Sequence, residues 1–268
     1  MLKDITLGQY YPTESIIHRL DPRVKLLATL MYLVSLFLFH DFVGFVVVTL
    51  FLLVIIKLSR VPFSFMLKGV RAIWVLVVIT AVCNLFFTQG DNTYFAWKFI
   101  HITDQGVSNT VYFTIRLIYL VIGSSLMTLT TTPNQLTDGL EKSLRPLNKI
   151  HVPVHEIAMM MSIALRFIPI LLEETDKIMK AQIARGADFE NGNLIQKVKN
   201  MVPLLVPLFI SAFRRANDLA MAMEARCYHG GDDRTQMKPL KYKKRDHIAY
   251  LILFAYLAVA IGFRMAGL

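Results

Sequence analysis

Two arginines occupy matching short stretches of the sequence, and their side chains are the first groups to consider for chemistry. The stretches are Ala184, Arg185 and Gly186, and Ala225, Arg226 and Cys227. A guanidinium keeps its charge and presents five donors in a planar fork, so it can bridge carboxylates and backbone carbonyls in a groove. Each arginine stands at the end of a long helical pattern and outside any catalytic cluster. We therefore interpret both as groups that recognise a partner.

The alternative interpretation is purely structural. An arginine at the C-terminal end of a helix complements the helix dipole, which is worth about 0.3–1 kcal/mol. For one arginine this alternative would be preferred. The same residue with the same alanine spacing at two helix ends favours recognition.

Two long helices must position these arginines. Pro153 can begin the first, which continues to Gly186, a residue typical of helix C-termini. At about 1.5 Å per residue this helix is about 48 Å long. The second runs from about Asn193 to Cys227. The apolar residues that recur at helical spacing in the first helix are Ile157, Met161, Leu165, Ile168 and Leu172.

Proline and threonine positions refine this region. Pro169, Pro203 and Pro207 lie inside the two long helices, where each removes an amide donor and predicts a bend. A short amphipathic helix precedes them, with Thr132 as N-cap and Pro133 at the first helical position. Its apolar residues are Leu136, Leu140 and Leu144.

The composition indicates a membrane protein. Hydrophobic residues make up 55% of the 268 residues, and the mean hydropathy is +0.50, against about 45–50% apolar residues in soluble domains. Uncharged runs of nearly spanning length predict five transmembrane helices, over residues 26–39, 42–56, 75–89, 107–132 and 248–263. The predicted domains are a membrane domain over residues 1–132, a cytoplasmic domain of amphipathic helices over 133–246, and a last membrane helix over 247–268.

The distribution of basic residues predicts the orientation. Lysines and arginines gather before the first span and between the second and third, whereas the outer loops, including the turn at His40 and Asp41, are poor in them. Short cytoplasmic loops retain positive charge, so the N-terminus and the long helices are expected in the cytoplasm. No cleavable signal peptide is expected.

The sequence lacks the common motifs for catalysis and for binding nucleotides or metals. The sequence lacks a G-x-x-x-x-G-K-[ST] phosphate loop and an H-E-x-x-H zinc motif, and no cofactor or metal is expected. The net charge of +10 is attributed to loops that face anionic lipid, not to nucleic-acid binding. The spans hold few ionisable groups, with Arg116 near the outer end of the fourth as the main exception, which argues against an ion-coupled carrier.

One alternative places the long helices across the bilayer. Against it, Arg166 would cost about 2.5–3.5 kcal/mol at a bilayer centre, and the apolar run from Met201 to Phe213 is short for a span. We expect instead that the apolar halves of these helices lie against membrane helices or the bilayer surface.

Three stretches resemble the transmembrane (T) component of energy-coupling-factor transporters: "SIIHRLDPRVKLL", "SIALRFIPILLEETDKIMKAQIARGADF" and "PLFISAFRRANDLAMAMEARCYHGGDDRT". The resemblance covers nearly the whole chain. It implies that the two arginine motifs dock into grooves on two ABC-type ATPases. Cys227 departs from the usual glycine of the second motif, which puts a tight backbone turn there in doubt.

The resemblance also implies the function. An all-α integral membrane protein of a prokaryotic cell membrane would transmit ATP-driven motion to a membrane-embedded, substrate-binding S component that imports a vitamin or other micronutrient. The chain itself would not be an enzyme. The residues expected to contact the S component are Met161, Leu165, Leu172 and Leu205. The alternative function is a self-sufficient secondary transporter or channel.

Overall fold

The computed structural model describes residues 9–39, 42–88, 93–97, 100–187, 189, 194–230, 237 and 239–265. The predicted turn at His40 and Asp41 lies outside these residues. The chain forms two compact units, which are described separately here. Gly8–Gly139 and Leu240–Leu268 form what we call the bundle unit, and Leu140–Pro239, together with Met1–Leu7, form the long-helix unit.

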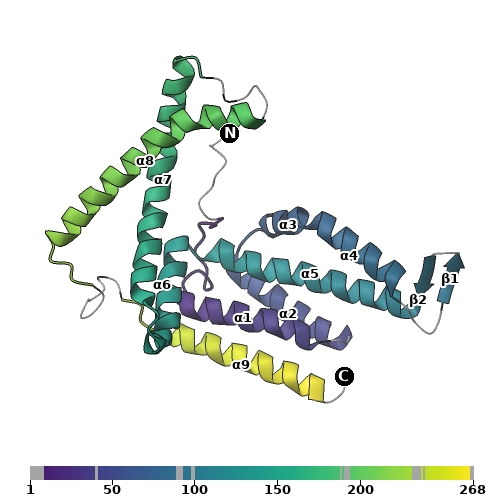
Figure 1. Ribbon diagram of the computed structural model, residues 1–268. Coiled ribbons are helices and arrows are strands. Elements are labelled where there is room, and N and C mark those ends of the chain that lie inside the picture. The colour runs from purple at the N-terminus through teal and green to yellow at the C-terminus, as the bar shows by residue number, and fades with distance from the viewer. Residues whose placement is uncertain are drawn as a thin grey trace. The chain divides into compact units, whose positions relative to one another are not determined.

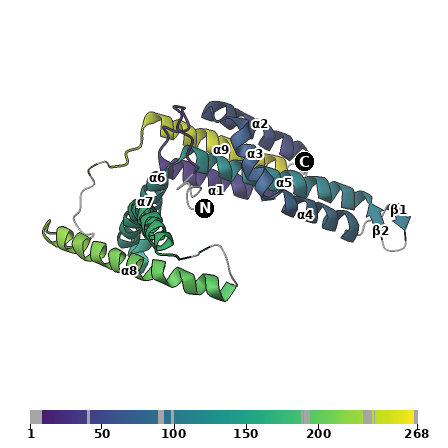
Figure 2. The same cartoon turned by 90° about the horizontal axis from the view of Figure 1, so that it is seen from above.

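Six helices and one hairpin make up the bundle unit. The helices are α1 (Pro22–Leu38), α2 (Phe42–Ser59), α3 (Phe63–Ala72), α4 (Trp74–Phe87), α5 (Asp104–Thr130) and α9 (Lys244–Met265). Helix α1 packs on α5 and α9, and α2 also contacts both, so the last helix of the chain lies beside the first (Figures 1 and 2). Each of the five predicted spans is therefore mainly helical in its described residues.

Two features near the third predicted span were not anticipated from the sequence. The basic stretch before it forms α3, and α3 and α4 meet at a bend of 59°. The segment after it contains strands β1 (Thr93–Trp97) and β2 (Ile100–Thr103), paired antiparallel. Figure 1 shows this hairpin at the end of α4 and α5, which extend together beyond α1 and α2.

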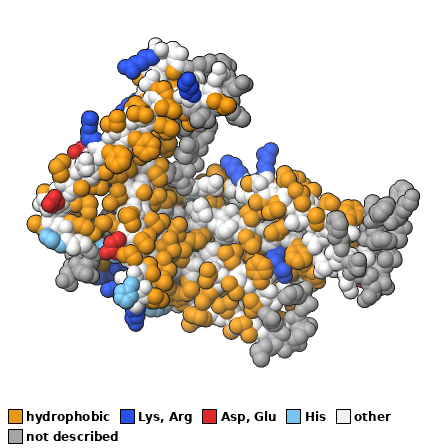
Figure 3. Space-filling view, in the orientation of Figure 1, with side chains coloured by type: hydrophobic (Ala, Val, Ile, Leu, Met, Phe, Trp, Pro, Cys, Tyr) orange, Lys and Arg blue, Asp and Glu red, His pale blue; other side chains and the backbone are white. Residues whose placement is uncertain are grey.

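The core of the bundle unit is aromatic and aliphatic. Leu36, Val48 and Met66 are fully buried in a cluster with Tyr32 and Ile122. Helices α1 and α5 approach closely at Gly123, where a Cβ atom would lie 2.3 Å from Cε1 of Tyr32. By contrast, many large apolar side chains point outward, and Figure 3 shows hydrophobic side chains over much of the face it draws. An apolar exterior is what a bundle surrounded by lipid requires.

A buried polar cluster joins the N-terminal ends of α1 and α9. Asp246 is 1% exposed, and its carboxylate accepts hydrogen bonds from the amides of Asp21 (2.9 Å) and Lys243 (2.7 Å). Asp21 in turn is the N-cap of α1 and accepts from the amide and side chain of Arg23, at 3.0 Å each. The Arg23 guanidinium also stacks over the Tyr242 ring, 3.9 Å from its centre. Two helix ends are therefore held together by carboxylates.

Lys25 connects the same region to α5. Its ammonium is buried and donates to the carbonyl oxygens of Thr130, at 2.8 Å, and His18, at 3.1 Å. Thr130 is the last residue of α5, so the lysine satisfies a carbonyl that has no partner within the helix. His18 is itself fixed by Ser15 and by the Tyr11 carbonyl, and burial lowers its pKa below the usual value. We call Asp21, Arg23, Lys25 and Asp246 the polar cluster.

Arg116 lies in the middle of α5 and reaches the end of α1 that precedes the predicted outer turn. Its place near the outer end of the fourth span stays a prediction. Its Nη2 donates to the carbonyl of Phe39, the C-cap of α1, at 2.8 Å. Three phenylalanine rings lie within 6 Å of the guanidinium carbon: Phe37, Phe45 and Phe113. Arg116 therefore closes the far end of α1 with a charged hydrogen bond shielded by aromatic rings.

The long-helix unit follows the predicted pattern closely. Helix α6 (Pro133–Leu144), which spans the boundary between the units, leads into the short helix η2 (Arg145–Ile150). Thr132 and Gln135 cap α6 reciprocally, each side chain accepting from the other's amide at 3.3 Å. Helix α7 (Val154–Ala184) and helix α8 (Leu194–Glu224) are the two long helices.

The set of helices that could cross a membrane differs in part from the prediction. Among the described residues, α2, α5, α7 and α9 are long and apolar enough, and the bent pair α3 and α4 would be a fifth. The predicted first span, α1, has 17 residues, the lower limit for a span. Helix α7 meets the length and composition criterion for a membrane span, whereas α8 does not. The alternative that the long helices cross the bilayer is therefore supported for α7 but not for α8.

The polar cluster should dominate the stability of the bundle unit. We expect Asp246→Ala to lower the free energy of unfolding by about 2–4 kcal/mol, because two buried amides lose a charged acceptor. Chemical denaturation in detergent would measure this. Glu14→Ala removes an exposed carboxylate paired with Arg19 and should cost less than about 1 kcal/mol. Equal losses for the two variants would contradict the role given to Asp246.

Candidate functional site

Helices α7 and α8 form an antiparallel pair. Glu174 of α7 accepts from the Ser211 hydroxyl and from Nη2 of Arg215, the latter at 2.9 Å. Nearer the end of α7, Gln182 donates to the carbonyl of Pro203, near the start of α8, at 3.4 Å. Late residues of one helix thus contact early residues of the other. The two C-terminal ends therefore lie at opposite ends of the pair, as Figure 1 shows.

The Gln182 contact follows from a proline. Pro207 has no amide hydrogen, so the carbonyl four residues earlier, on Pro203, loses its partner within α8. The Gln182 amide reaches this carbonyl from α7. The unpaired carbonyl of α8 thereby accepts a hydrogen bond from α7, one helical turn before Arg185. The bends predicted at Pro169, Pro203 and Pro207 remain predictions, since each proline lies inside a helix that runs without a break.

Small residues allow the two helices to approach. Ala212, Ala216 and Ala220 recur every four residues on α8 and, with Phe167 and Leu171 of α7, line a groove of about 280 Å³. Arg215, paired with Glu174, also lines it. The contact between the helices is therefore mainly apolar, with one ion pair that fixes its register.

The two arginine motifs have the same backbone structure. After α7, the amides of Gly186 and Ala187 donate to the carbonyls of Ile183 (2.9 Å) and Gln182 (3.0 Å). After α8, the amides of Cys227 and Tyr228 donate to the equivalent carbonyls of Glu224 (2.9 Å) and Met223 (3.1 Å). This pair of bonds is the Schellman arrangement that ends many helices. The repeated sequence therefore encodes a repeated helix end.

The doubt about Cys227 is settled by its backbone. Gly186 has φ of 90° and Cys227 has φ of 56°, so both occupy the left-handed region that the motif requires. A residue with a Cβ atom loses about 1–2 kcal/mol there. The tight turn forms in spite of that cost, and Cys227 replaces glycine without changing the hydrogen bonds.

Both arginine side chains are available to a partner. All six motif residues are exposed: Ala184, Arg185, Gly186, Ala225, Arg226 and Cys227. Within the part of the chain that the structure describes, neither guanidinium has a hydrogen-bond or ion-pair partner. Each charge lies next to residues with small side chains at the tip of a helix, an arrangement that can enter a groove lined by carboxylates or carbonyls.

Helix α8 also carries an exposed apolar stripe. Its residues recur at intervals of one and three along one face, and each is at least 41% exposed: Met201, Val202, Leu205, Val206, Phe209, Ile210 and Phe213. Of the four residues predicted to contact a membrane partner, Leu205 lies in this stripe. Met161 is exposed on α7, whereas Leu165 and Leu172 are half-buried.

Some contacts of the site were not found from the sequence. Glu174, Gln182 and Ser211 were not singled out, although they join the two helices. The available signal was weak: Glu174 and Arg215 are opposite charges at the edges of apolar runs, but nothing local shows that those runs face each other. Among the described residues, no group of three or more His, Cys, Asp or Glu side chains could hold a metal ion.

Comparison with known proteins places the chain in a transporter family. The family model described as "Cobalt transport protein" (CbiQ) matches residues 13–238. The chain is 58% identical over 262 residues to the energy-coupling factor transporter transmembrane protein EcfT of Clostridium kluyveri, with 97% of each chain covered. The proteins of the same name from Acidaminococcus fermentans and Bacillus subtilis are 50% and 45% identical, over 100% and 96% of this chain and 99% and 98% of theirs.

The left-handed residues predict opposite effects of two substitutions. Gly186→Ala places a Cβ atom in the left-handed region and should speed hydrogen exchange at the Ala187 amide about tenfold, the ratio expected from a cost of about 1–2 kcal/mol. Cys227→Gly relieves the same cost and should slow exchange at Tyr228. Hydrogen exchange followed by mass spectrometry measures both. Gly262→Ala, inside α9, is the matched control and should affect neither amide; unchanged exchange in Gly186→Ala would contradict the motif.

Proposed function

This chain belongs to the EcfT family of energy-coupling factor transporter transmembrane proteins, and we propose that it is the scaffold that couples two ABC-type ATPases to a substrate-binding S component. The chain is a non-catalytic, multi-pass membrane subunit of a transporter. The finer assignments, which are the ATPases, the S component and the residues that contact them, are our proposal.

One observation carries the proposal. The two helix ends have the same hydrogen bonds, a left-handed residue at the same position and the same exposed arginine, and they lie at opposite ends of one helix pair. Two equivalent attachment points suit two related partners, such as the two ATPases of an ABC-type pair. The helix dipole does not require an arginine at the end of either helix, and it does not explain why the alanine spacing recurs.

The helix pair can transmit movement between these points. Each helix has 31 residues and is therefore about 46 Å long. Polar contacts at Glu174 and Gln182 join the helices, and a groove lined by alanine and apolar side chains makes up much of their contact. When the ATPases close or open around ATP, the helix ends would move with them. The crossing angle would then change at the smooth apolar contact.

The exposed stripe of α8 supplies a surface for the S component. A stripe of large apolar side chains needs a cover that is either lipid or protein. We propose that the S component covers it, because it adjoins the helix contact whose angle would change. Met161 and Leu205 would belong to this surface, and the half-buried Leu165 and Leu172 would support it from within α7.

The orientation belongs to the same proposal. ATP is cytoplasmic, so docking of ATPases at Arg185 and Arg226 would place both helix ends on the cytoplasmic side of the cell membrane. We propose the same side for the N-terminal end of α1, because the basic residues before α1 and between α2 and α4 favour it. The substrate, which we expect to be a vitamin or other micronutrient, would be chosen by the S component.

Charge reversal at the helix ends tests the docking of ATPases. Arg185→Glu or Arg226→Glu should leave partial co-purification of the ATPases, because the other contact holds them at high effective concentration, but should abolish most transport. The double variant should lose the ATPases, since opposing a charge inside a groove costs about 2–5 kcal/mol at each site. Pull-downs with measured stoichiometry and uptake in cells provide the two readouts.

Arg166→Glu with Arg214→Glu is the matched control, because it reverses two exposed charges on the same helices away from their ends. It should retain both ATPases. If the Arg185 and Arg226 double variant bound both ATPases at normal strength, these arginines would be helix-end charges and no more.

A charge in the exposed stripe tests the S component. Leu205→Glu should weaken co-purification of the S component at least tenfold, since a carboxylate buried in an apolar contact loses its hydration, while ATPase binding persists. Asn217→Glu adds the same charge farther along α8, past the stripe, and should leave both partners bound. If Leu205→Glu retained the S component at normal strength, the stripe would not be its docking surface; loss of both partners would indicate misfolding instead.

A further inference from the structure

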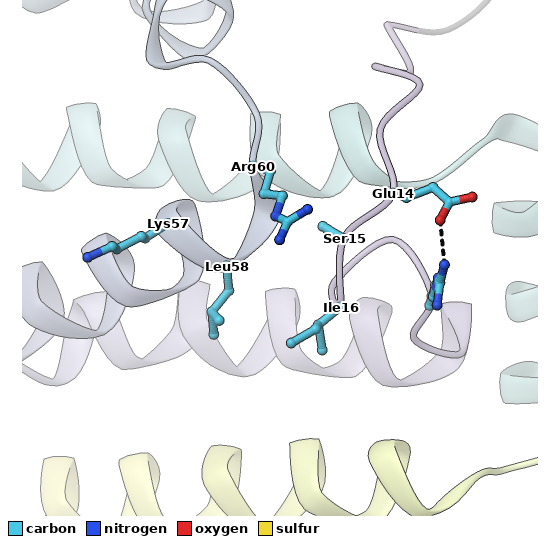
Figure 4. A pocket seen from close by; sticks show the side chains of 7 residues that line it. Glu14, Ser15, Ile16, Lys57, Leu58 and Arg60 are labelled. Atoms are coloured by element: carbon cyan, nitrogen blue, oxygen red, sulfur yellow. Dashed lines mark hydrogen bonds and ion pairs between the residues drawn. The ribbon is translucent and has the colours of Figure 1, made fainter.

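A basic pocket lies at the end of α2 in the bundle unit. It has a volume of about 450 Å³ and is lined by residues 14–16 and 19 of the N-terminal segment and by Lys57, Leu58 and Arg60. Figure 4 shows Arg60 between the end of α2 and the segment that carries Ser15. Of the three cations, Arg19 is paired with Glu14. Lys57 and Arg60 have no ion-pair partner among the described residues.

Arg60 is held in an unusual backbone conformation. Its φ is 55°, in the left-handed region where glycine is the usual residue and another side chain costs about 1–2 kcal/mol. The neighbouring turn is fixed by Ser59, whose hydroxyl donates to the Ile56 carbonyl and accepts from the Val61 amide. A glycine would end α2 at lower cost. An arginine at this position indicates that its charge has a use.

An apolar groove adjoins the basic pocket. It has a volume of about 210 Å³ and is lined by α1, α2, α5 and α9, with Ala28, Phe51, Ile55 and Leu253 among its walls. Leu58 lines both the groove and the basic pocket. In the N-terminal segment, Ile16 lines the basic pocket and the adjacent Ile17 lines the groove. In Figure 4, Leu58 and Ile16 point to the same side of the pocket.

The charged group in the groove wall, the Lys25 ammonium, already has hydrogen-bond partners within the protein. It donates to two backbone carbonyls. The charge offered to a ligand therefore lies at the mouth, on Arg60 and on Lys57 of the preceding helical turn, whose side chain points away from Arg60 in Figure 4. The interior offers apolar surface. This arrangement matches a molecule with an anionic head and a flexible apolar tail.

We propose that this joined pocket and groove is a binding site for one anionic phospholipid, with its phosphate at Arg60, its headgroup near Lys57, and part of an acyl chain in the groove. Of the molecules that contain both parts, phospholipids surround this chain on all sides in the membrane. An acidic peptide would be attracted by the two cations, but it has no use for an apolar groove between four helices. Free phosphate would leave the groove unused.

The site would fix the bundle at the membrane surface. The groove reaches Thr130 and Val24, next to the polar cluster that joins the ends of α1, α5 and α9. A bound acyl chain would fill the space between these helices. The anionic lipid would therefore stabilise the helix ends from which the long-helix unit begins and to which it returns.

Native mass spectrometry of the full chain in detergent, with phosphatidylglycerol or phosphatidylcholine added, tests the proposal. The wild-type chain should retain one phosphatidylglycerol in preference to phosphatidylcholine. Lys57→Gln with Arg60→Gln should reduce that preference about 30-fold, the ratio expected from the usual contribution of two basic residues near an anionic lipid. Lys68→Gln with Arg71→Gln removes the same charge from exposed positions of α3 and should reduce it less than about threefold.

Two further measurements separate the parts of the site. Ala28→Phe fills the groove and should reduce retention of both lipids, while its thermal melting confirms that the chain folds. Inorganic phosphate at millimolar concentration should not displace phosphatidylglycerol. The proposal is overturned if Lys68→Gln with Arg71→Gln has the larger effect, if Ala28→Phe folds and retains lipid normally, or if phosphate alone displaces the lipid.

Discussion

The backbone groups at the ends of helices are the constraint on which this structure depends. Inside a bilayer no water is available to bond the amides and carbonyls that a helix leaves unpaired at its ends, and each unpaired group costs several kcal/mol. In the bundle unit, Asp21 and Asp246 accept from amides at the starts of α1 and α9. Lys25 and Arg116 donate to carbonyls at the ends of α5 and α1. These few charged side chains hold the ends of α1, α5 and α9 against one another.

The last carbonyls of the helices in the long-helix unit also need partners, but there the partners are backbone amides. Helices α7 and α8 satisfy their last carbonyls with their own backbone, by the Schellman bonds of Gly186 and Cys227 and the residues that follow them. No side chain is needed to cap them, so Arg185 and Arg226 remain available. The carbonyl of Pro203, freed by a proline, is satisfied by Gln182 of the neighbouring helix. Helix ends whose carbonyls are bonded by their own backbone thus leave nearby charged side chains exposed. At buried helix ends, charged side chains instead bond the free amides and carbonyls.

Charge and apolar surface are distributed accordingly. In the bundle unit, the cations not consumed by helix ends include Lys57 and Arg60, which border an apolar groove at the end of α2. In the long-helix unit, exposed arginines terminate the helices and an apolar stripe runs along α8. If the proposals above hold, lipid, S component and ATPases would bind separate surfaces, and a change at one surface need not disrupt binding at another.

The sequence by itself determined most of the helices, but not α3. The boundaries of α6 and α7 agree with their capping residues Thr132, Pro153 and Gly186, and the repeated arginines predicted the repeated helix ends, because caps and left-handed residues are local features. Resemblance to a known family then identified the partners to expect. Only the tertiary structure decided the 59° bend between α3 and α4, the hairpin after them, the position of Arg116 against α1, and the pairing of Asp246 with Asp21, which are 225 positions apart. These features depend on which helix ends meet in space, and a pattern of spacing along one chain segment carries no information about a distant partner.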